Sequence, residues 1–547
     1  MIFKNKITLI LIPLIIFFFY IFIYNFIHFE GNKFLYFLFS IFSFYLIISI
    51  FFEKKYFSEV FLSIYLWLGF WWKFSISQWY YKSDQIILSA SEGFVSTTID
   101  PKLLDETFFS LIISFLAIIV TSKIFKIFSK EDFNIESKNE IFFAEFYLRY
   151  RKNILFFYLS FFIIIGASNL YYGIFQKGLI NNNDINIFVL NFYKWIILIG
   201  ATMLGAIILF YEIKIKSTKV LFVATIVIFQ NFIISSSNLS RAMILDCSSI
   251  LYGLNKSVQK YVKKNNLNIF KLVIIMFLFF FLSFSLSVNL RQKFFSWNYQ
   301  ITKNNFIEKN ITIKNYEKNR DFLMQYDENI KKEIVNEEKK IFRVEERSLE
   351  YYKNLFVKTF KSVTLMSKKI FNEIFYLSIN RWIGIDSMII VSNYTERNFK
   401  IFLEAFSEKV SPGDNTYYEK IFIKKFNNLE NSSFPSRDIS KYNEKGNQIV
   451  GIITPGFISF FHYPKNNFFL FFAICTVFLI VLSFEKFFYF FSGNNLILVS
   501  FFSHLMIYRL MHFGYLPSQT YFFFGTLFLS VLFLFFTKKL ILKFIKK

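Results

Sequence analysis

Long apolar runs recur along the chain, and one long polar stretch, about Asn289 to Lys465, separates two groups of them. A membrane-spanning helix needs about 20 consecutive, mostly apolar residues. Ile269–Val288 reaches that length, and Phe468–Phe484 and Tyr521–Phe536 come close to it. The pattern therefore predicts an integral membrane protein with one large domain outside the bilayer, where a soluble substrate could be met.

Counting these runs predicts an all-α, polytopic membrane protein with about a dozen transmembrane helices. A transmembrane region over 1–288 holds about nine of them, a large extramembrane domain covers 289–466, and a second transmembrane region over 467–547 holds about three. The predicted spans are 7–28, 34–52, 57–75, 107–127, 153–173, 188–211, 219–236, 241–255, 269–288, 468–484, 488–510 and 519–537.

The polar domain is predicted to be mainly helical. From Asp321 to Phe360, charged and apolar residues follow each other with helical spacing, and no strand pattern of comparable length is present. Ser411–Asp414 marks a turn, and Gly446–Gly456 is typical of a loop that leads back to the membrane.

Lysine and arginine residues gather in alternate connections between the spans, and this pattern orients the chain. The connections near Lys54, Lys138, Lys214 and Lys256 are basic, as is the C-terminal tail, whereas the loop 76–106 is rich in acidic residues. Because basic loops stay in the cytoplasm, both termini are predicted to be cytoplasmic. The large domain is then extracellular, or periplasmic in a bacterium with two membranes.

Composition supports the membrane class. Hydrophobic residues make up 55% of the chain, and the mean hydropathy is +0.43. The net charge of +24 would suggest nucleic acid in a soluble protein, but basic cytoplasmic loops explain it here, and nucleic-acid binding is not expected. Cys247 and Cys475 form neither a disulfide framework nor a metal-ligand spacing. Met1–Tyr24 lacks a small-residue cleavage site and is interpreted as an uncleaved first span.

Four arginines lie at predicted outer positions. Charge at the edge of a span costs free energy, so these residues are candidates for a function. Arg241 lies at a turn between two spans, Arg291 at the entry to the domain, and Arg509 at the outer end of a span. Arg381 lies in an apolar segment of the domain. Each could simply reach lipid headgroups with its long side chain. Together they predict a site for phosphate or pyrophosphate, because guanidinium groups are always charged and fork onto phosphate oxygens.

A pyrophosphate-linked lipid is the expected ligand, and if it carries a sugar the same cations could stabilise the leaving pyrophosphate. An acceptor hydroxyl then needs a base, for which His462, His512 and Asp386 are the candidates. Structural roles stay open, with His462 as a turn residue and Asp386 as an ion-pair partner of Arg381. Asp246, inside a span, needs a partner that the sequence does not identify. No metal or other cofactor is expected, because the outer loops carry no Asp-x-Asp pair and no His-rich spacing.

The layout resembles the bacterial Wzy-type polymerases of O-antigen and exopolysaccharide, with about a dozen spans, cytoplasmic ends and one large external loop late in the chain. Ser240-Arg241-Ala242 is similar to the small-residue-plus-Arg element of that family. Asn380-Arg381-Trp382-Ile383-Gly384, Thr454-Pro455-Gly456-Phe457 and His512-Phe513-Gly514 also look like segments of one branch of the oligosaccharide repeat-unit polymerases.

The resemblance implies a glycosyltransferase of the bacterial inner membrane with a GT-C-like or O-antigen-ligase-like fold. It implies that undecaprenyl-pyrophosphate-linked repeat units of lipopolysaccharide O-antigen or of exopolysaccharide are polymerised on the outer face, without metal or nucleotide sugar. Arg241, Arg381 and Arg509 match as phosphate or glycan contacts, whereas the resemblance leaves the position of the base open between His462 and His512. A flippase and a chain-length regulator are the protein partners that the resemblance implies.

Other classes stay open. An O-antigen ligase would transfer the glycan to the lipid A core. A lipid-phosphosugar glycosyltransferase usually shows an acidic motif in its first external loop, and Asp100-Pro101 and Asp105-Glu106 lie in an early external loop here. A transporter or flippase without covalent chemistry predicts polar residues in many spans and a two-fold repeat. The spans are mostly apolar and the large domain breaks any symmetry.

Overall fold

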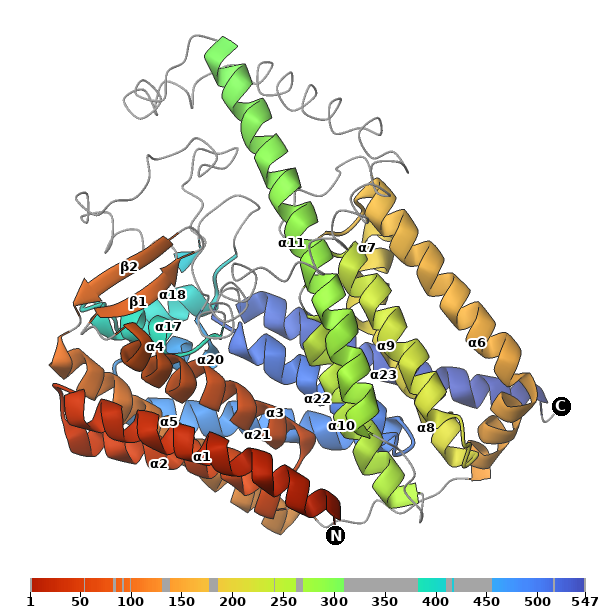
Figure 1. Ribbon diagram of the computed structural model, residues 1–547, viewed down its shortest axis with the longest axis horizontal. Coiled ribbons are helices and arrows are strands. Elements are labelled where there is room, and N and C mark those ends of the chain that lie inside the picture. Colours follow the sequence, from red (N-terminus) through yellow and green to blue (C-terminus); the bar gives the residue numbers. More distant parts are fainter. Residues whose placement is uncertain are drawn as a thin grey trace.

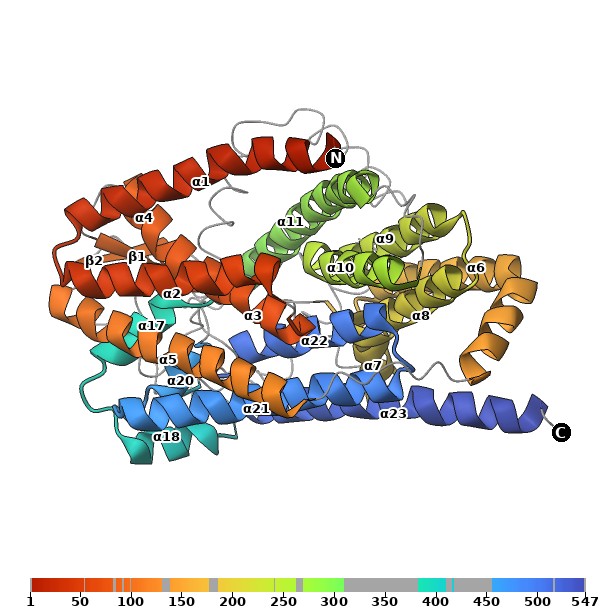
Figure 2. The same cartoon turned by 90° about the horizontal axis from the view of Figure 1, so that it is seen from below.

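The computed structural model is a bundle of long helices that lie side by side (Figures 1 and 2). It describes residues 2–53, 55–81, 85–90, 93–98, 100–129, 138–176, 185–240, 242–261, 269–308, 382–409, 416–417, 455–514 and 517–545. Within these ranges the only sheet is one antiparallel hairpin, β1 (Gln85–Ala90) with β2 (Gly93–Thr98). The predicted helical class is therefore confirmed for the described chain, with this hairpin as a small addition.

Nine helical stretches of the described chain are long and apolar enough to cross a membrane, and each overlaps at least one predicted span. They are Lys33–Phe52, Phe57–Tyr80, Pro101–Phe128, Glu140–Tyr172, Ile187–Lys214, Val220–Ser237, Ile269–Ser287, Asn467–Phe491 and Pro517–Lys543. Two shorter apolar helices, Ile15–His28 and Leu496–Met511, accompany them. The chain is thus a multi-pass helical membrane protein, as the hydropathy pattern predicts.

The described chain holds the following elements. In chain order they are α1 (Ile2–His28), α2 (Lys33–Phe52), α3 (Phe57–Leu66), η1 (Trp67–Trp72), α4 (Lys73–Tyr81), the hairpin, α5 (Pro101–Phe128), α6 (Lys138–Tyr172), α7 (Ile187–Trp195), η2 (Ile196–Gly200), α8 (Ala201–Lys214), α9 (Val220–Ser237), α10 (Met243–Tyr261), α11 (Ile269–Glu308), α17 (Ile385–Asn393), α18 (Phe399–Phe406), α20 (Phe457–Phe461), α21 (Asn467–Phe491), α22 (Leu496–Met511) and α23 (Pro517–Ile545). The segments η1 and η2 are π-helical turns within longer helices.

Two predicted spans differ from the helices that form. The span 241–255 corresponds to α10, whose polar residues keep it out of the group of nine. The span 488–510 is wrong at its start, because α21 continues to Phe491 and α22 begins only at Leu496. Between them, Gly493 and Asn494 adopt positive φ and close a tight turn. Hydropathy alone therefore does not predict this break between α21 and α22, because the apolar run continues across it.

The short helix α22 lies at the centre of the bundle, in contact with α3, α8 and α10 (Figure 2). All of its side chains are buried except Tyr508 and Arg509, which are partly exposed. Asn495 caps its start by accepting the backbone N–H of Ile497 at 3.1 Å. Any ionisable group on α22 is thus held within the protein and away from lipid, where a charge is costly.

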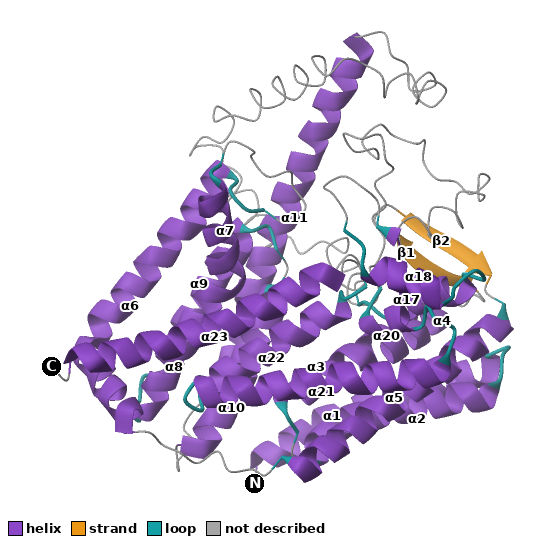
Figure 3. Cartoon of the chain, turned by 180° about the vertical axis from the view of Figure 1, so that it is seen from behind, coloured by secondary structure: helices purple, strands orange, loops and turns teal. Residues whose placement is uncertain are grey.

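The short helices α17, α18 and α20 gather at one end of the bundle, which we name the domain end (Figures 1 and 3). There α17 contacts α5, α20 contacts α21, and Gly514 donates its backbone N–H to Pro455 O at 2.9 Å. The opposite end, named the basic end, carries Lys55, Lys214 and Lys538. Most of the predicted domain 289–466 lies outside the described residues. Its first part continues α11 as one helix to Glu308 rather than beginning at 289.

Trp71 is a packing residue and not an interfacial anchor. The position of Trp71, Trp72 and Trp79 near a predicted span end suggests a belt of aromatic residues at the bilayer surface. In the structure Trp71 is fully buried and donates its indole N–H to Ser40 Oγ at 3.0 Å. The span continues to Tyr80 as η1 and α4, so Trp71 lies well inside it.

Gly69 and Gly384 form the closest backbone contact between the domain end and the spans. A Cβ atom on Gly384 would lie 2.1 Å from the carbonyl oxygen of Gly69, and one on Gly69 would lie 2.0 Å from the carbonyl oxygen of Ile383. Backbone cannot yield as a flexible side chain can. The segment before α17 therefore docks on the π-helical turn η1 only because both residues are glycine.

Replacing Gly384 with alanine should separate these two segments and lower the thermal midpoint of the purified protein. The matched control is Gly525→Ala on α23, because a Cβ atom there has no neighbour within 4 Å. Equal midpoints for the two variants, measured by tryptophan fluorescence on heating, would contradict this close contact.

Candidate functional site

His504, near the middle of α22, lies at the centre of the most concentrated buried polar cluster on this helix. Its Nε2 lies 3.0 Å from the hydroxyl of Tyr65 on α3, and the two rings are nearly parallel with centroids 6.2 Å apart. Phe61, one turn earlier on α3, packs edge-on against the imidazole. His504 is 3% exposed, so its ring orientation is fixed by these neighbours.

Asp246 approaches the other nitrogen of His504 from the first turn of α10. Its Oδ1 lies 3.8 Å from Nδ1 of His504, which is an ion-pair distance but longer than a direct hydrogen bond. This neighbour is the partner that the sequence could not identify for a carboxylate inside a span. A carboxylate on this side favours the tautomer with the proton on Nδ1, which leaves Nε2 as the proton acceptor facing Tyr65.

Two aromatic residues complete the surroundings of Tyr65. Trp382, just before α17, lies edge-on to the Tyr65 ring with centroids 5.9 Å apart, and Tyr508 lies 6.4 Å away. Tyr508 also stands one turn after His504, with ring centroids 6.2 Å apart. Residues from α3, α10, α22 and the segment before α17 therefore meet at one place.

Two residues of this cluster are sequence neighbours of arginines that were predicted to bind phosphate. Trp382 follows Arg381, and Tyr508 precedes Arg509. Arg241 and Arg381 themselves lie outside the described residues. Arg291 lies on α11, but the position of its side chain is not described. Arg509 is the one arginine of the predicted set with a described side chain.

Arg509 is partly buried, and no acidic partner is found for it among the described residues. Its Nη2 donates to Gln519 Oε1 on α23 at 2.9 Å, while its Nε has no partner there. The other two partly buried arginines in the described chain differ, since Arg151 pairs with Glu212 and Arg397 pairs with Glu106. Arg509 therefore retains positive charge that an anionic ligand could neutralise.

Asp386 pairs with Lys73. Its Oδ2 lies 2.6 Å from Nζ of Lys73, and both side chains are almost completely buried. The same ammonium donates to Trp382 O at 3.1 Å. Helix α17 begins at Ile385, and the predicted pairing of Asp386 with Arg381 lies outside the described residues. Asp386 was predicted as a possible base, and the structure places it in a buried ion pair that fastens Trp382 to the span.

The two predicted histidines differ in their surroundings. His462 is 2% exposed beside α20, and neither ring nitrogen has a hydrogen-bond partner in the described chain. Burial, with a smaller contribution from Arg397, lowers the pKa of His462 well below its usual range, so this imidazole is neutral. His512 is partly exposed at the end of α22, with Nδ1 2.8 Å from Tyr508 O. A carbonyl only accepts, so Nδ1 carries the proton and Nε2 keeps its lone pair.

The acidic residues of the early external loop have structural partners. Asp100 caps α5 by accepting the backbone N–H of Lys102 at 2.9 Å. Asp105 accepts the backbone N–H of Asn32 at 2.7 Å, and Glu106 pairs with Arg397. These contacts hold helix ends together at the domain end. No contact that they make favours a role as a catalytic acidic motif.

Sequence reasoning did not select His504, Tyr65 or Lys73 as site residues. One signal could have found His504 and Lys73, because an ionisable residue inside an apolar run is a functional candidate in its own right. Tyr65 carries no such signal, since tyrosines are common along these helices.

Comparison of the chain with protein-family models, with curated proteins and with solved structures finds no match.

Proposed function

We propose that this chain is a glycosyltransferase of the bacterial inner membrane that polymerises undecaprenyl-pyrophosphate-linked oligosaccharide repeat units. The product is O-antigen or exopolysaccharide on the outer face of the membrane. The observation that carries the proposal is the cluster of Tyr65, His504 and Asp246, buried among the spans and bordered by segments that hold candidate arginines. A proton relay next to anion-binding groups is what transfer from a lipid pyrophosphate to a sugar hydroxyl requires.

In the proposed reaction, the acceptor hydroxyl oxygen bonds to the anomeric carbon of the donor glycan. The bond from that carbon to the pyrophosphate oxygen breaks, and its electron pair leaves with the lipid pyrophosphate. Tyr65 accepts the hydroxyl proton while its own phenolic proton moves to Nε2 of His504, across the 3.0 Å contact. Asp246 stabilises the imidazolium that forms.

Arginine side chains are proposed to hold the pyrophosphate and to stabilise its growing charge, so that no metal is needed. Arg509 carries this role most directly, because no described carboxylate neutralises it. Arg241, Arg291 and Arg381 remain candidates for the same role. Of the three predicted bases, His512 is partly exposed, with its Nδ1 at Tyr508 O, and His462 and Asp386 are enclosed.

Replacing Arg509 with alanine should shorten the surface polysaccharide to single or few repeat units, because one charge-assisted contact to the leaving group is lost. The measurement is the ladder of polysaccharide lengths on a gel, in a strain that lacks the gene and carries either wild type or the variant. Arg149→Ala is the matched control, since Arg149 is exposed on α6 and lies 5.7 Å from the Tyr150 ring centroid.

The gel also separates the alternatives. Loss of all surface sugar, including single units, would favour a ligase, a flippase or an earlier transferase. A ladder of normal length with Arg509→Ala would remove this residue from the site. Shortening by Arg149→Ala as well would show a general effect of lost charge rather than a site.

We further propose that the basic end faces the cytoplasm, with both termini there and the domain end in the periplasm. The excess of lysine at the basic end supports this orientation. A reporter enzyme that is active only in the periplasm should stay inactive when fused after Lys547. Activity of that fusion would reverse the assignment. A flippase and a chain-length regulator are proposed as partners in the same membrane.

A further inference from the structure

The short helix α18, at the domain end, presents three different faces to its surroundings. Phe402 and Ala405 form the first face, and both are buried against the bundle. Lys400 and Glu404 are about one helical turn apart and form the second, which is exposed and which we name the charged face. A helix on the surface of a protein in water needs only these two faces.

The third face of α18, named the apolar face, consists of Phe399, Leu403 and Phe406. Residues three or four positions apart are neighbours on a helix, so these three side chains form one stripe. They are 50%, 49% and 37% exposed. Leaving apolar surface in water forgoes about 25 cal/mol for each Å² that could be buried. We therefore expect something other than water to cover this face.

Helix α18 lies on the outside of the bundle, beside the beginning of two membrane spans (Figure 2). The rings of Phe399 and Phe402 contact that of Phe469 on α21, with centroids 5.6 and 5.2 Å apart. Phe406 contacts Tyr521 on α23 at 5.7 Å. Phe469 and Tyr521 are the third and fifth residues of their helices. The helix α18 is thus at the level where these spans begin.

Large apolar side chains of both spans are exposed at this level. Phe468 and Phe472 on α21 and Phe522 on α23 are exposed, and each is within three residues of a residue that α18 contacts. Because they belong to the first turns of membrane spans, acyl chains are expected to cover them. A lipid surface also accommodates both open faces of α18, since its acyl chains suit the apolar face and its headgroups suit the charged one.

We propose that α18 lies at the surface of the leaflet at the domain end, with its apolar face among the upper acyl chains and its charged face among the headgroups. The described segment 382–409 is then attached at two places. The ion pair of Lys73 with Asp386 holds its beginning inside the bundle, and α18 holds its later part at the membrane surface. The inference rests on the membrane architecture and not on the proposed enzymatic function.

Quenching of a single fluorescent label by lipid and by water-soluble ions tests this arrangement. A bimane label is attached to Leu403→Cys or to Lys400→Cys in the full-length protein in nanodiscs. Cys475→Ser removes the partly exposed natural cysteine, and Cys247 is buried. Phospholipids brominated on the upper acyl chain should quench the label on Leu403→Cys about three-fold more than that on Lys400→Cys. Iodide in the water should quench the two labels in the opposite order.

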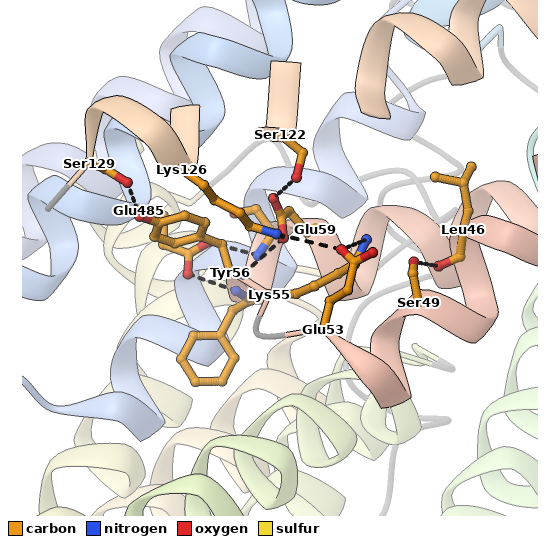
Figure 4. Close-up of polar contacts among 12 residues, drawn as sticks. Leu46, Ser49, Glu53, Lys55, Tyr56, Glu59, Ser122, Lys126, Ser129 and Glu485 are labelled. Carbon is orange, nitrogen blue, oxygen red and sulfur yellow. Dashed lines mark hydrogen bonds and ion pairs between the residues drawn. The ribbon is translucent and has the colours of Figure 1, made fainter. Parts of the chain in front are cut away.

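Phe52→Cys is the control for a side chain that acyl chains cover. Phe52 is exposed at the end of the span α2 and precedes Glu53, which pairs with Lys55 and Lys126 at the basic end (Figure 4). A label there should be quenched by the brominated lipid. Leu403 is half exposed, so its labelled variant should fold normally, which a melting midpoint equal to that of wild type would establish.

Three results would overturn the proposal. Equal quenching by iodide on Leu403→Cys and Lys400→Cys would show that the apolar face is open to water. Protection of Leu403→Cys from both quenchers would show that protein, such as a second copy of this chain, covers that face. Equal quenching of the two labels by brominated lipid would show that α18 is immersed on all sides, which contradicts a charged face among the headgroups.

Discussion

Replacing His504 with alanine should lower chain elongation by about 10²- to 10⁴-fold, while the protein remains in the membrane. The imidazole is the proposed acceptor of the proton that leaves the acceptor sugar through Tyr65, whose hydroxyl it meets at 3.0 Å. Tyr65→Phe should cause a loss of similar size, because it breaks the same relay. Asp246→Asn should cost less, since it removes only the charge that stabilises the imidazolium.

The measurement is the rate of polymer formation in membranes, divided by the amount of tagged protein present. His28→Ala is the matched control, because His28 is exposed at the end of α1 and its Nδ1 contacts only Tyr24 O, at 2.7 Å, as His512 contacts Tyr508 O. Activity of Tyr65→Phe within two- or three-fold of wild type, about 0.5 kcal/mol of barrier, would show that the relay does not carry the reaction.

Breaking the pair of Lys73 and Asp386 should cost about 3–5 kcal/mol of stability for either single replacement. Lys73→Met removes the ammonium that pairs with the buried Asp386 carboxylate, and Asp386→Leu removes the carboxylate that pairs with the buried Lys73 ammonium. Lys73→Met should also release Trp382 from the span, because that ammonium holds its carbonyl. We therefore expect lower thermal midpoints and reduced activity for both single variants.

The double variant Lys73→Met with Asp386→Leu separates charge from packing. Replacing both partners with apolar residues leaves no unpaired charge and should restore most of the lost stability. Activity should stay reduced, because Trp382 remains without its anchor. A double variant no more stable than the two single variants would show that the pair acts through shape rather than charge. Lys486→Met on α21, beside Phe125 and without a carboxylate contact, is the control for loss of a lysine within a span.

The sequence predicted the membrane architecture well, because hydropathy over about 20 residues reports directly on the bilayer. The sequence-based prediction failed for segments that neighbouring helices bury, because hydropathy does not distinguish contact with protein from contact with lipid. The helix α22 is short and carries His504, yet neighbouring helices cover it, so neither its length nor its polarity matches a simple span. Trp71 was misplaced for the same reason, since protein surrounds it at a point where a belt residue would meet the lipid surface.

The partners of the ionisable residues could not be predicted from the sequence. Lys73 and Asp386, and likewise Asp246 and His504, lie on segments that are remote in the chain, and no periodicity links them. Sequence reasoning offered Arg381 as one possible partner of Asp386, and this pairing lies outside the described residues. The fold places Lys73, from a span remote in the chain, beside Asp386. The arginine segments could be selected from the sequence, because the cost of charge near lipid is a local property, and their role stays a prediction.

The most direct test of the central claim uses purified protein and a lipid-pyrophosphate-linked repeat unit, with a metal chelator present. The account predicts products with two or more repeat units, together with one free undecaprenyl pyrophosphate for each new linkage, and loss of both with the Tyr65→Phe variant. Unchanged substrate with wild type, or release of the lipid pyrophosphate by hydrolysis without longer glycans, would contradict a polymerase.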